Sequence, residues 1–529
     1  MKSVRQSFIK CKAYWVFLLK KNIDCAILLF FGFLLRLSFL FQPFMADEFY
    51  DILASLMITY KGFPELPSGN WWLSGGANLY FQAAFLKVFG PLSYAIRIPS
   101  LLMSTLSIFV IYKLGALINK RVAIVASFLW AIDLGALEWG GYARQYAIFP
   151  LCFFTSVFFF YKAGLRDDFK HKDSFFAFLF YFLAVWSHAP AMFFLPSLVL
   201  LYGSLQIKKI RYDNFFSSSI FKNISCLTLV LCLISGVFYK IMNYLDSGLL
   251  YSAAQVGSLL YLPFSFWDFG CRIYYFLYSN FFNAPVRFFS FSSLVLYICF
   301  FCYKIITRRD KYDKKIPKLF VALVLVFSSN LIFMALFCYG QPGYALGLVG
   351  ILYVIAGICI DALLSTCNKY MKYILYSVFC VLIVCASIFN FNHRRVSADN
   401  NFEYSVKAFE YVIENAEKGD AILSSDPLFF IMADLHKKSE FNYYHYCVHC
   451  GLTLVKKEEK LYDRFLGGRN IRNISDVDEL FKNNKRVWWF FFEHHVSSAI
   501  SFPKIITNHI LRKMKKVCEI DKIRILKYG

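Results

Sequence analysis

The sequence is dominated by apolar segments that are long enough to cross a lipid bilayer. A crossing helix needs about 20 predominantly apolar residues, and about 11 segments come near that length. They lie near residues 24–42, 94–117, 122–139, 146–162, 174–187, 190–206, 222–244, 284–306, 317–339, 343–365 and 372–391. With 58% hydrophobic residues and a mean hydropathy of +0.51, a soluble protein of 529 residues would expose too much apolar surface. We therefore expect an α-helical polytopic membrane protein.

Basic residues predict the orientation of these helices. The chain has 57 Lys and Arg residues and 34 Asp and Glu residues, and its net charge of +23 is spread over short loops. Such loops usually face the anionic lipids of the cytoplasmic side, so we do not expect nucleic-acid binding. Placing the basic loops inside predicts a cytoplasmic N-terminus in the plasma (inner) membrane and outer loops at 43–93 and 245–283. The first 23 residues are only patchily apolar, so no cleavable signal peptide is expected.

The sequence changes character near residue 392. FEYSVKAFEYVIENAEKGDAILSSD, at 402–426, predicts an amphipathic helix, a Gly-Asp turn and a short strand. RVWWFFFEHH and KVCEIDKIRILKY predict further strands. We expect a transmembrane domain over 1–391 and a small α/β domain over 392–529, outside the cytoplasm in the periplasm or extracellular space.

One cysteine pair stands apart from the cysteines of the apolar segments. Cys447 and Cys450 form a C-x-x-C motif beside His445 and His449. A closed zinc site normally has a second pair of ligands at a set distance, so this motif alone is a weak metal signal. Three interpretations stay open: no special role, a disulfide, or a metal site.

Three carboxylates follow the first apolar segment. In FLFQPFMADEFYDILA, residues 39–54, Asp47, Glu48 and Asp51 lie at the edge of the membrane core, where a charge is costly unless it has a use. They could cap the following helix or take part in chemistry. Asp47 and Asp51 share a helical face and could hold a divalent ion, but we favour an exposed helical acid for Asp51.

The predicted outer loops add arginines, which can hold a phosphate through paired donors. A membrane enzyme that joins a lipid-phosphate substrate to an acceptor hydroxyl needs both acids and arginines. Structural interpretations stay open: Arg144 could anchor the chain at headgroup level, and His188 could be a satisfied polar group at a helix end. Tyr142 and Tyr146 are typical of the aromatic belt at a membrane interface. Arg36 could snorkel or pair with Asp47.

Four stretches, in order along the chain, resemble the GT-C glycosyltransferases. They are most similar to the branch of the protein O-mannosyltransferases and the lipid A aminoarabinose transferase. The stretches are the Asp-Glu pair after an apolar helix, YFQAAFLKVFGPLSYAIRIPSLL at 80–102, YARQYA at 142–147 and WSH at 186–188. The resemblance is good over 24–205, weaker up to 391, and architectural beyond. It implies a GT-C type transmembrane domain.

This resemblance implies an inverting transfer of a sugar from a polyprenyl-phosphate donor, on the outer face of the membrane, to a lipid, cell-envelope glycan or protein acceptor. Asp47, with Glu48, would be catalytic, because a carboxylate can take the proton of the acceptor hydroxyl as its oxygen attacks the anomeric carbon. The leaving phosphate would need only positive charge, from Arg144 and Arg272. No cofactor is expected. The substrate-lining residues would be His188, Tyr142, Tyr146, Trp71 and Trp72.

One stretch departs from the family's pattern. Members commonly carry Glu-Lys-Pro or His-Pro-Pro where this chain has Ser74, Gly75 and Gly76. A phosphate-side lysine or loop histidine is therefore missing, which leaves the donor's identity open. Two other functions stay open: a catalytically silent relative, and a polytopic transporter of lipid or glycan, although the paired repeats of many transporters are not evident.

Overall fold

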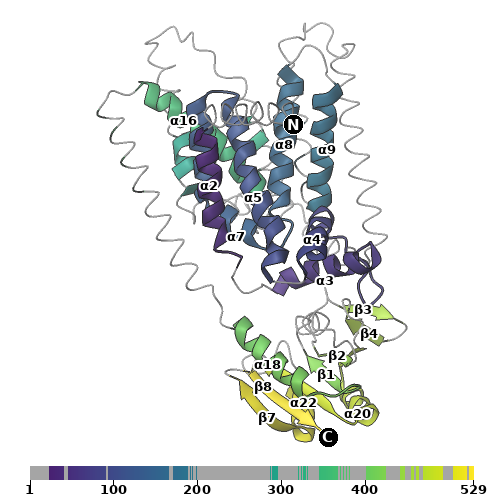
Figure 1. The fold of residues 1–529 in the computed structure, drawn as a ribbon. Coiled ribbons are helices and arrows are strands. Elements are labelled where there is room, and N and C mark those ends of the chain that lie inside the picture. Colours follow the sequence, from purple (N-terminus) through teal and green to yellow (C-terminus); the bar gives the residue numbers. More distant parts are fainter. Residues whose placement is uncertain are drawn as a thin grey trace, which may run out of the picture. The chain divides into compact units, whose positions relative to one another are not determined.

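The structure is a computed structural model, and it describes the chain in several stretches. These are residues 23–40, 46–90, 93–165, 171–188, 286–287, 289–295, 345–366, 401–424, 441–446, 454–457, 460–463, 469–492, 504–520 and 523–529, with isolated residues or short runs between 191 and 381. The chain divides into two compact units. The first contains the long apolar helices, and the second contains a helical pair and a β-sheet; each is described by itself (Figure 1).

The first unit is a bundle of apolar helices. Helices α8 and α9 run side by side (Figure 1). Helix α6 packs against both α2 and α16. The bundle is built from α2 (Ile23–Leu37), α5 (Ser93–Ala116), α6 (Lys120–Ile132), α7 (Leu134–Gly141), α8 (Ile148–Leu165), α9 (His171–Ser187) and α16 (Leu346–Thr366).

Within the described residues, two helices are long and apolar enough to span a membrane, Ala95–Ala116 and Leu346–Ser365. They match the segments predicted over 94–117 and 343–365. The segment predicted over 122–139 is not one straight helix, because α6 and α7 meet at an angle of 58°. Five predicted segments lie wholly or largely outside the described residues: 190–206, 222–244, 284–306, 317–339 and 372–391. The count of about 11 spans therefore stays a prediction.

The helical pair of the second unit lies within the predicted outer loop 43–93. Helices α3 (Ala46–Lys61) and α4 (Gly76–Phe89) pack together, and Ser55 Oγ donates to Gln82 Oε1 at 2.8 Å across them. The connection folds back on itself through a bridge between Glu65 and Trp71. Gly75, just before α4, has a φ of +73°, a left-handed conformation that a residue with a Cβ adopts only with strain.

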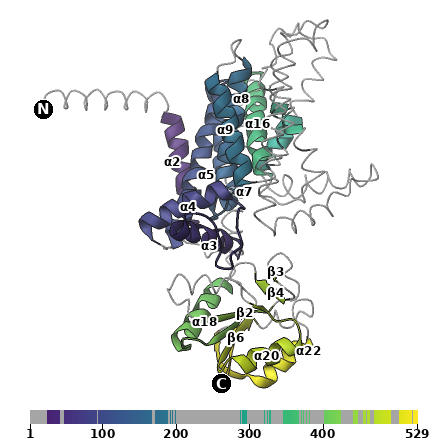
Figure 2. The same cartoon turned by 90° about the vertical axis from the view of Figure 1, so that its right-hand side faces the viewer.

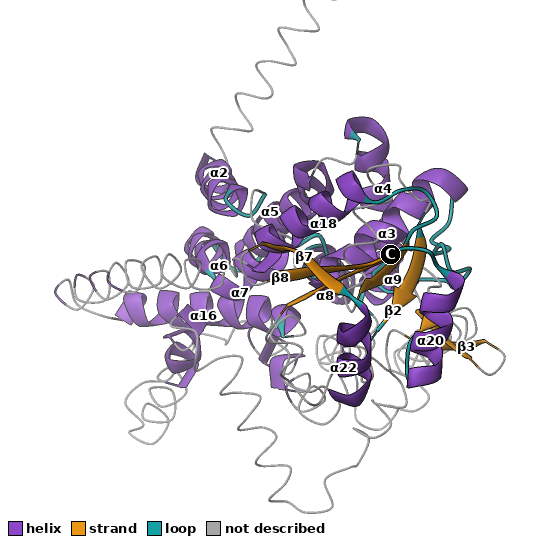
Figure 3. Cartoon of the chain, turned by 90° about the horizontal axis from the view of Figure 1, so that it is seen from below, coloured by secondary structure: helices purple, strands orange, loops and turns teal. Residues whose placement is uncertain are grey.

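The second unit also contains an eight-stranded mixed sheet in the order β3-β4-β5-β2-β1-β6-β8-β7. The four strands β5, β2, β1 and β6 are parallel, and antiparallel strands complete both edges. The strands are β1 (Ala421–Ser424), β2 (Asn442–His445), β3 (Leu454–Lys457), β4 (Lys460–Asp463), β5 (Arg469–Asn470), β6 (Val487–Phe492), β7 (Lys515–Ile520) and β8 (Ile523–Tyr528). Helix α18 (Asn401–Asn415) lies on one face, and α20 (Ile474–Asn483) and α22 (Lys504–Lys513) lie on the other (Figures 2 and 3).

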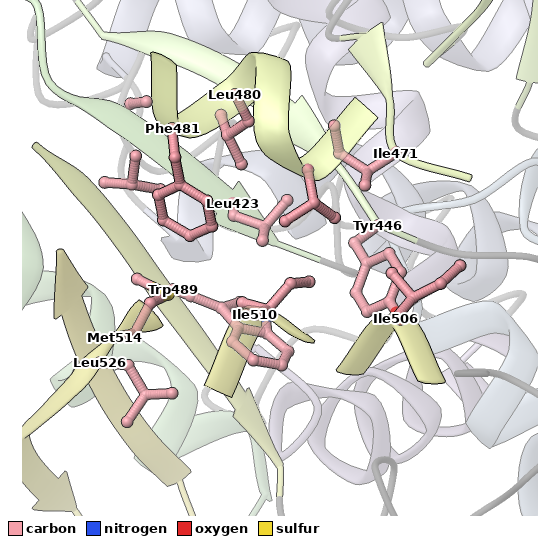
Figure 4. Close-up of a cluster of buried hydrophobic side chains, with 13 residues drawn as sticks. Leu423, Tyr446, Ile471, Leu480, Phe481, Trp489, Ile506, Ile510, Met514 and Leu526 are labelled. Carbon is pink, nitrogen blue, oxygen red and sulfur yellow. The ribbon is translucent and has the colours of Figure 1, made fainter. Parts of the chain in front are cut away.

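The sheet buries both of its faces because its side chains alternate. Trp488 packs with Ile422 on the α18 side, whereas Trp489 packs with Leu423 on the side of α20 and α22. Figure 4 shows this second core, with Phe481 among its members. A strand that is covered on both faces reads as a continuous apolar run, which explains the sequence VWWFFF of β6. The position of this sheet outside the cytoplasm stays a prediction.

Candidate active site

The turn between α7 and α8 carries the YARQYA motif. Arg144 is a partly exposed residue whose backbone N donates to Tyr142 O at 2.7 Å. Its guanidinium lies 5.6 Å from the centre of the Tyr146 ring. A cation over an aromatic face is held in place by the ring's quadrupole. The turn therefore presents a positioned guanidinium at the end of the bundle's α7.

His188, directly after α9, completes this cluster. Its ring centroid lies 5.5 Å from that of Tyr146 and 5.1 Å from that of Phe149, and only 4% of the residue is exposed. Three of the predicted site residues, Arg144, Tyr146 and His188, thus come together from two separate helix ends.

The two tyrosines of the motif do not form an interface belt. Tyr142 is 7% exposed and Tyr146 is 4% exposed, so both are buried in the bundle. Tyr142 donates its hydroxyl hydrogen to Glu138 Oε1 at 3.1 Å, and Trp139 packs edge-on against both tyrosine rings. The belt interpretation is therefore wrong: both rings are buried, and the ring of Tyr146 packs against Arg144 and His188.

The acids of the opening motif lie on α3. Asp47 is the second residue of the helix, and its side chain lies outside the part of the chain that the structure describes. Glu48 and Asp51 are completely buried. Asp51 Oδ1 accepts a hydrogen bond from Trp72 Nε1 at 2.9 Å, because the connection after α3 folds back over the helix. The prediction of an exposed acid at Asp51 is therefore wrong.

Both predicted tryptophans lie in that connection. Trp71 stacks on Phe63 with ring centroids 5.2 Å apart, and Trp72 packs against Tyr50 while its indole nitrogen bonds Asp51. Trp72 therefore ties the connection to α3.

Several buried charges were missed or misread from the sequence. Arg36 is fully buried and its Nε donates to Ser104 Oγ at 2.7 Å, so the snorkelling interpretation is wrong. Asp133 is fully buried as well, paired with Arg287. Asp133 carried a usable signal, as an acid in the middle of an apolar segment, which usually marks a functional or structural site.

Some predictions fall outside the described residues. Arg272, Cys447 and Cys450 are among them. In the part of the chain that is described, no group of three or more His, Cys, Asp or Glu side chains is arranged to hold a metal ion. The divalent site considered at Asp47 and Asp51 stays untested, since only one of its two carboxylates is described.

Residues 77–239, which include the cluster of Arg144, Tyr146 and His188, match the family model described as dolichyl-phosphate-mannose-protein mannosyltransferase. A search of curated proteins gives no match.

Solved structures match nearly the whole chain. ArnT from Cupriavidus metallidurans in the apo state is 12% identical, with a TM-score of 0.55 and 98% of each chain covered. The same enzyme bound to undecaprenyl phosphate also gives 0.55, covering 97% of this chain and 98% of that one. The oligosaccharyltransferase AglB from Archaeoglobus fulgidus, in complex with an inhibitory peptide and a dolichol-phosphate, is 13% identical, with a TM-score of 0.51 over 93% of this chain and 72% of its own. At these identities the likeness concerns the fold alone, and it agrees with the GT-C type transmembrane domain that the sequence resemblance implies.

Proposed function

We propose that the protein is an inverting glycosyltransferase that moves a sugar from a polyprenyl-phosphate donor to an acceptor on the outer face of the membrane. The observation that carries this proposal is the cluster of Arg144, Tyr146 and His188, within the segment that matches the mannosyltransferase model. The ArnT structure with undecaprenyl phosphate supports the donor class, because that ligand is the carrier part of such a donor.

Arg144 is the proposed partner of the donor phosphate. Its planar guanidinium offers paired N–H donors that match phosphate oxygens, and its partial exposure leaves it accessible. The rings of Tyr142 and Tyr146 and the imidazole of His188 would form the wall of the donor subsite. Arg272 is proposed as a second cation, on the sequence alone.

Asp47 is the proposed general base, on the strength of the family resemblance. Its carboxylate would take the proton of the acceptor hydroxyl while the acceptor oxygen forms a bond to the anomeric carbon. The bond from that carbon to the phosphate oxygen breaks, and polyprenyl phosphate leaves as an anion that needs no acid. Glu48 is proposed as a second catalytic carboxylate beside Asp47. Trp71 and Trp72 are proposed to line the acceptor side. The acceptor is a lipid, a cell-envelope glycan or a protein, and no cofactor enters these steps.

Release of free polyprenyl phosphate tests this proposal. The purified protein, incubated with a mixed pool of polyprenyl-phosphate sugars and membrane extract as acceptor, should release it from at least one donor. Asp47→Asn should reduce the release by about 100- to 10,000-fold, the usual contribution of a general base, without loss of folded protein. Glu65→Gln is the matched control and should retain activity, because Glu65 is a partly exposed acid that forms an ion pair with Lys61 at 3.2 Å. A transporter or a silent relative would release none, and robust turnover by folded Asp47→Asn would contradict the mechanism.

The orientation in the membrane is part of the proposal. A reporter fused after residue 392 should be active only outside the cytoplasm, and a reporter fused at residue 310 only inside it. The opposite result at either position would remove the proposed site from the outer face.

A further inference from the structure

A buried ion pair lies at the break between α6 and α7, formed by Asp133 and Arg287. Asp133 lies at the break with an extended backbone, and its Oδ1 accepts a hydrogen bond from Ala136 N at 2.7 Å. The side chain therefore caps α7 and replaces the backbone bonds that the break removes. The break is therefore stabilised by a specific side-chain hydrogen bond.

Residues far away in the sequence hold this carboxylate. Arg287 donates from Nε to Asp133 Oδ2 and from Nη2 to Asp133 Oδ1, both at 2.8 Å. Tyr353 of α16 adds a hydroxyl bond to Oδ2 at 2.5 Å. A carboxylate that accepts a paired guanidinium, a phenol and a backbone amide has a single allowed orientation. Asp133 therefore fixes the start of α7 to α16 and to the segment of Arg287.

Arg36 holds the other side of the break. Its Nη1 donates to Ala131 O at 3.3 Å, a carbonyl in the last turn of α6, while its Nε bonds Ser104 of α5. The backbone group that the break leaves without a helical partner is thus bonded by a fully buried guanidinium.

Helix α7 has no room to shift sideways. A Cβ placed on Gly135 would overlap the guanidinium of Arg287, and one on Gly140 would overlap Ser104 Oγ. Close packing of this kind transmits a movement at the break to the far end of the helix.

We propose that Asp133 is a positioning residue that places Arg144 for the donor phosphate. The proposal rests on the proposed function, in which Arg144 binds that phosphate. Helix α7 has 8 residues and ends at Gly141, three positions before Arg144. Over a length of about 12 Å, a tilt of about 5° at the break displaces the end of α7 by about 1 Å. A displacement of that size can cost about 100-fold in a reaction that depends on alignment.

Hydrogen–deuterium exchange of the full-length protein in nanodiscs tests the positioning directly. Asp133→Asn keeps the size of the side chain but removes the charge that Arg287 binds, so exchange at residues 134–147 should rise, while exchange in α8 stays unchanged. Binding of undecaprenyl phosphate should weaken by up to about tenfold, the loss expected for the Arg144 contact itself. Asp361→Asn is the matched control: Asp361 also joins α16 to the α6 region, through Asn119 at 2.7 Å, but at the opposite end of α6. This variant should change neither quantity.

Two further variants keep the test decisive. Tyr353→Phe removes one hydrogen bond and leaves the ion pair, so it should produce a smaller change of the same kind even where Asp133→Asn folds poorly. Arg144→Lys combined with Asp133→Asn should bind the probe no more weakly than Arg144→Lys alone, because both changes act through one contact.

Unchanged exchange at 134–147 in folded Asp133→Asn would overturn the positioning role, as would additive effects in the double variant. Failure of the unaltered protein to bind undecaprenyl phosphate would count against the proposed function instead, and the exchange data alone would then decide whether Asp133 holds α7.

Discussion

Two Asp–Arg pairs, one in the helical bundle and one in the β-sheet, are built to the same pattern. In the bundle, Arg287 Nε meets Asp133 at 2.8 Å and Tyr353 adds an aromatic donor. In the sheet, Arg486 Nε meets Asp420 at 2.8 Å and Trp488 Nε1 adds a bond at 2.9 Å. In each pair a backbone amide also donates to the carboxylate.

The pairs differ in their access to water. The side chains of Arg287 and Asp133 are 3% and 0% exposed, whereas those of Arg486 and Asp420 are 22% and 6% exposed. Arg486 also bonds Glu417, whose side chain is 74% exposed. A buried charge that loses its partner cannot be rehydrated, but a charge at the surface can. The same arrangement of atoms is therefore a rigid constraint in the bundle and a modest stabiliser in the sheet.

The largest effect is expected from removing one arginine of each pair. Arg287→Met leaves the Asp133 carboxylate buried without its cation and should cost about 3–5 kcal/mol of local stability. Arg486→Met, the matched variant, should cost about 1 kcal/mol or less, because water and ions reach that site. Native-state hydrogen exchange of α7 and β6 measures both values. Equal losses of stability in the two variants would show that burial does not determine how strongly each ion pair stabilises the protein.

Arg144 extends the comparison to a guanidinium that lies against an aromatic ring. Arg144→Lys keeps the positive charge but loses the planar fork and its stacking on Tyr146. We expect undecaprenyl phosphate to bind about tenfold more weakly, the equivalent of about 1.4 kcal/mol, with an unchanged melting temperature. An unchanged affinity would remove Arg144 from the donor site.

The smallest effect is expected at Asp478, an exposed acid of α20 that pairs with His509 and Lys513 of α22. Hydrogen bonds from His509, and then from Lys513, lower the pKa of the Asp478 carboxyl. A lowered pKa in the folded state means that the stabilisation is present above the unfolded pKa of about 3.9 and is lost as the pH falls through the folded value. Melting temperatures should therefore converge for the unaltered protein and Asp478→Asn in acid. A constant difference between pH 7 and pH 3 would contradict this account.

The sequence predicts the apolar helices well and their interruptions poorly. Helices α5 and α16 follow from uninterrupted apolar segments, because hydropathy is a local property of the chain. The break at Asp133 depends on partners 154 and 220 residues away, which no local pattern contains. The number of spans also stays a prediction, because five of the predicted segments lie wholly or largely outside the described residues.

In the candidate site, too, the local motifs could be predicted from the sequence, whereas contacts that depend on the fold could not. The YARQYA and WSH motifs identified Arg144, Tyr146 and His188, and these three residues do come together in the bundle. Burial of Asp51 could not be predicted, because it depends on the fold of the connection that brings Trp72 back to α3. In the sheet, the continuous apolar run VWWFFF of β6 marks both faces of the strand as buried, and this run is visible in the sequence itself.

The long sequence separation within the Asp133 cluster also sets an order for biosynthesis. Tyr353 is 220 residues downstream of Asp133, so a ribosome working at about 5–20 residues per second needs roughly 10–40 s to reach it. During that interval Asp133 has been synthesised without its aromatic donor, and for most of it without Arg287. A nascent chain that stops before residue 287 therefore contains every residue of the YARQYA and WSH motifs but neither of the distant side chains that bind Asp133.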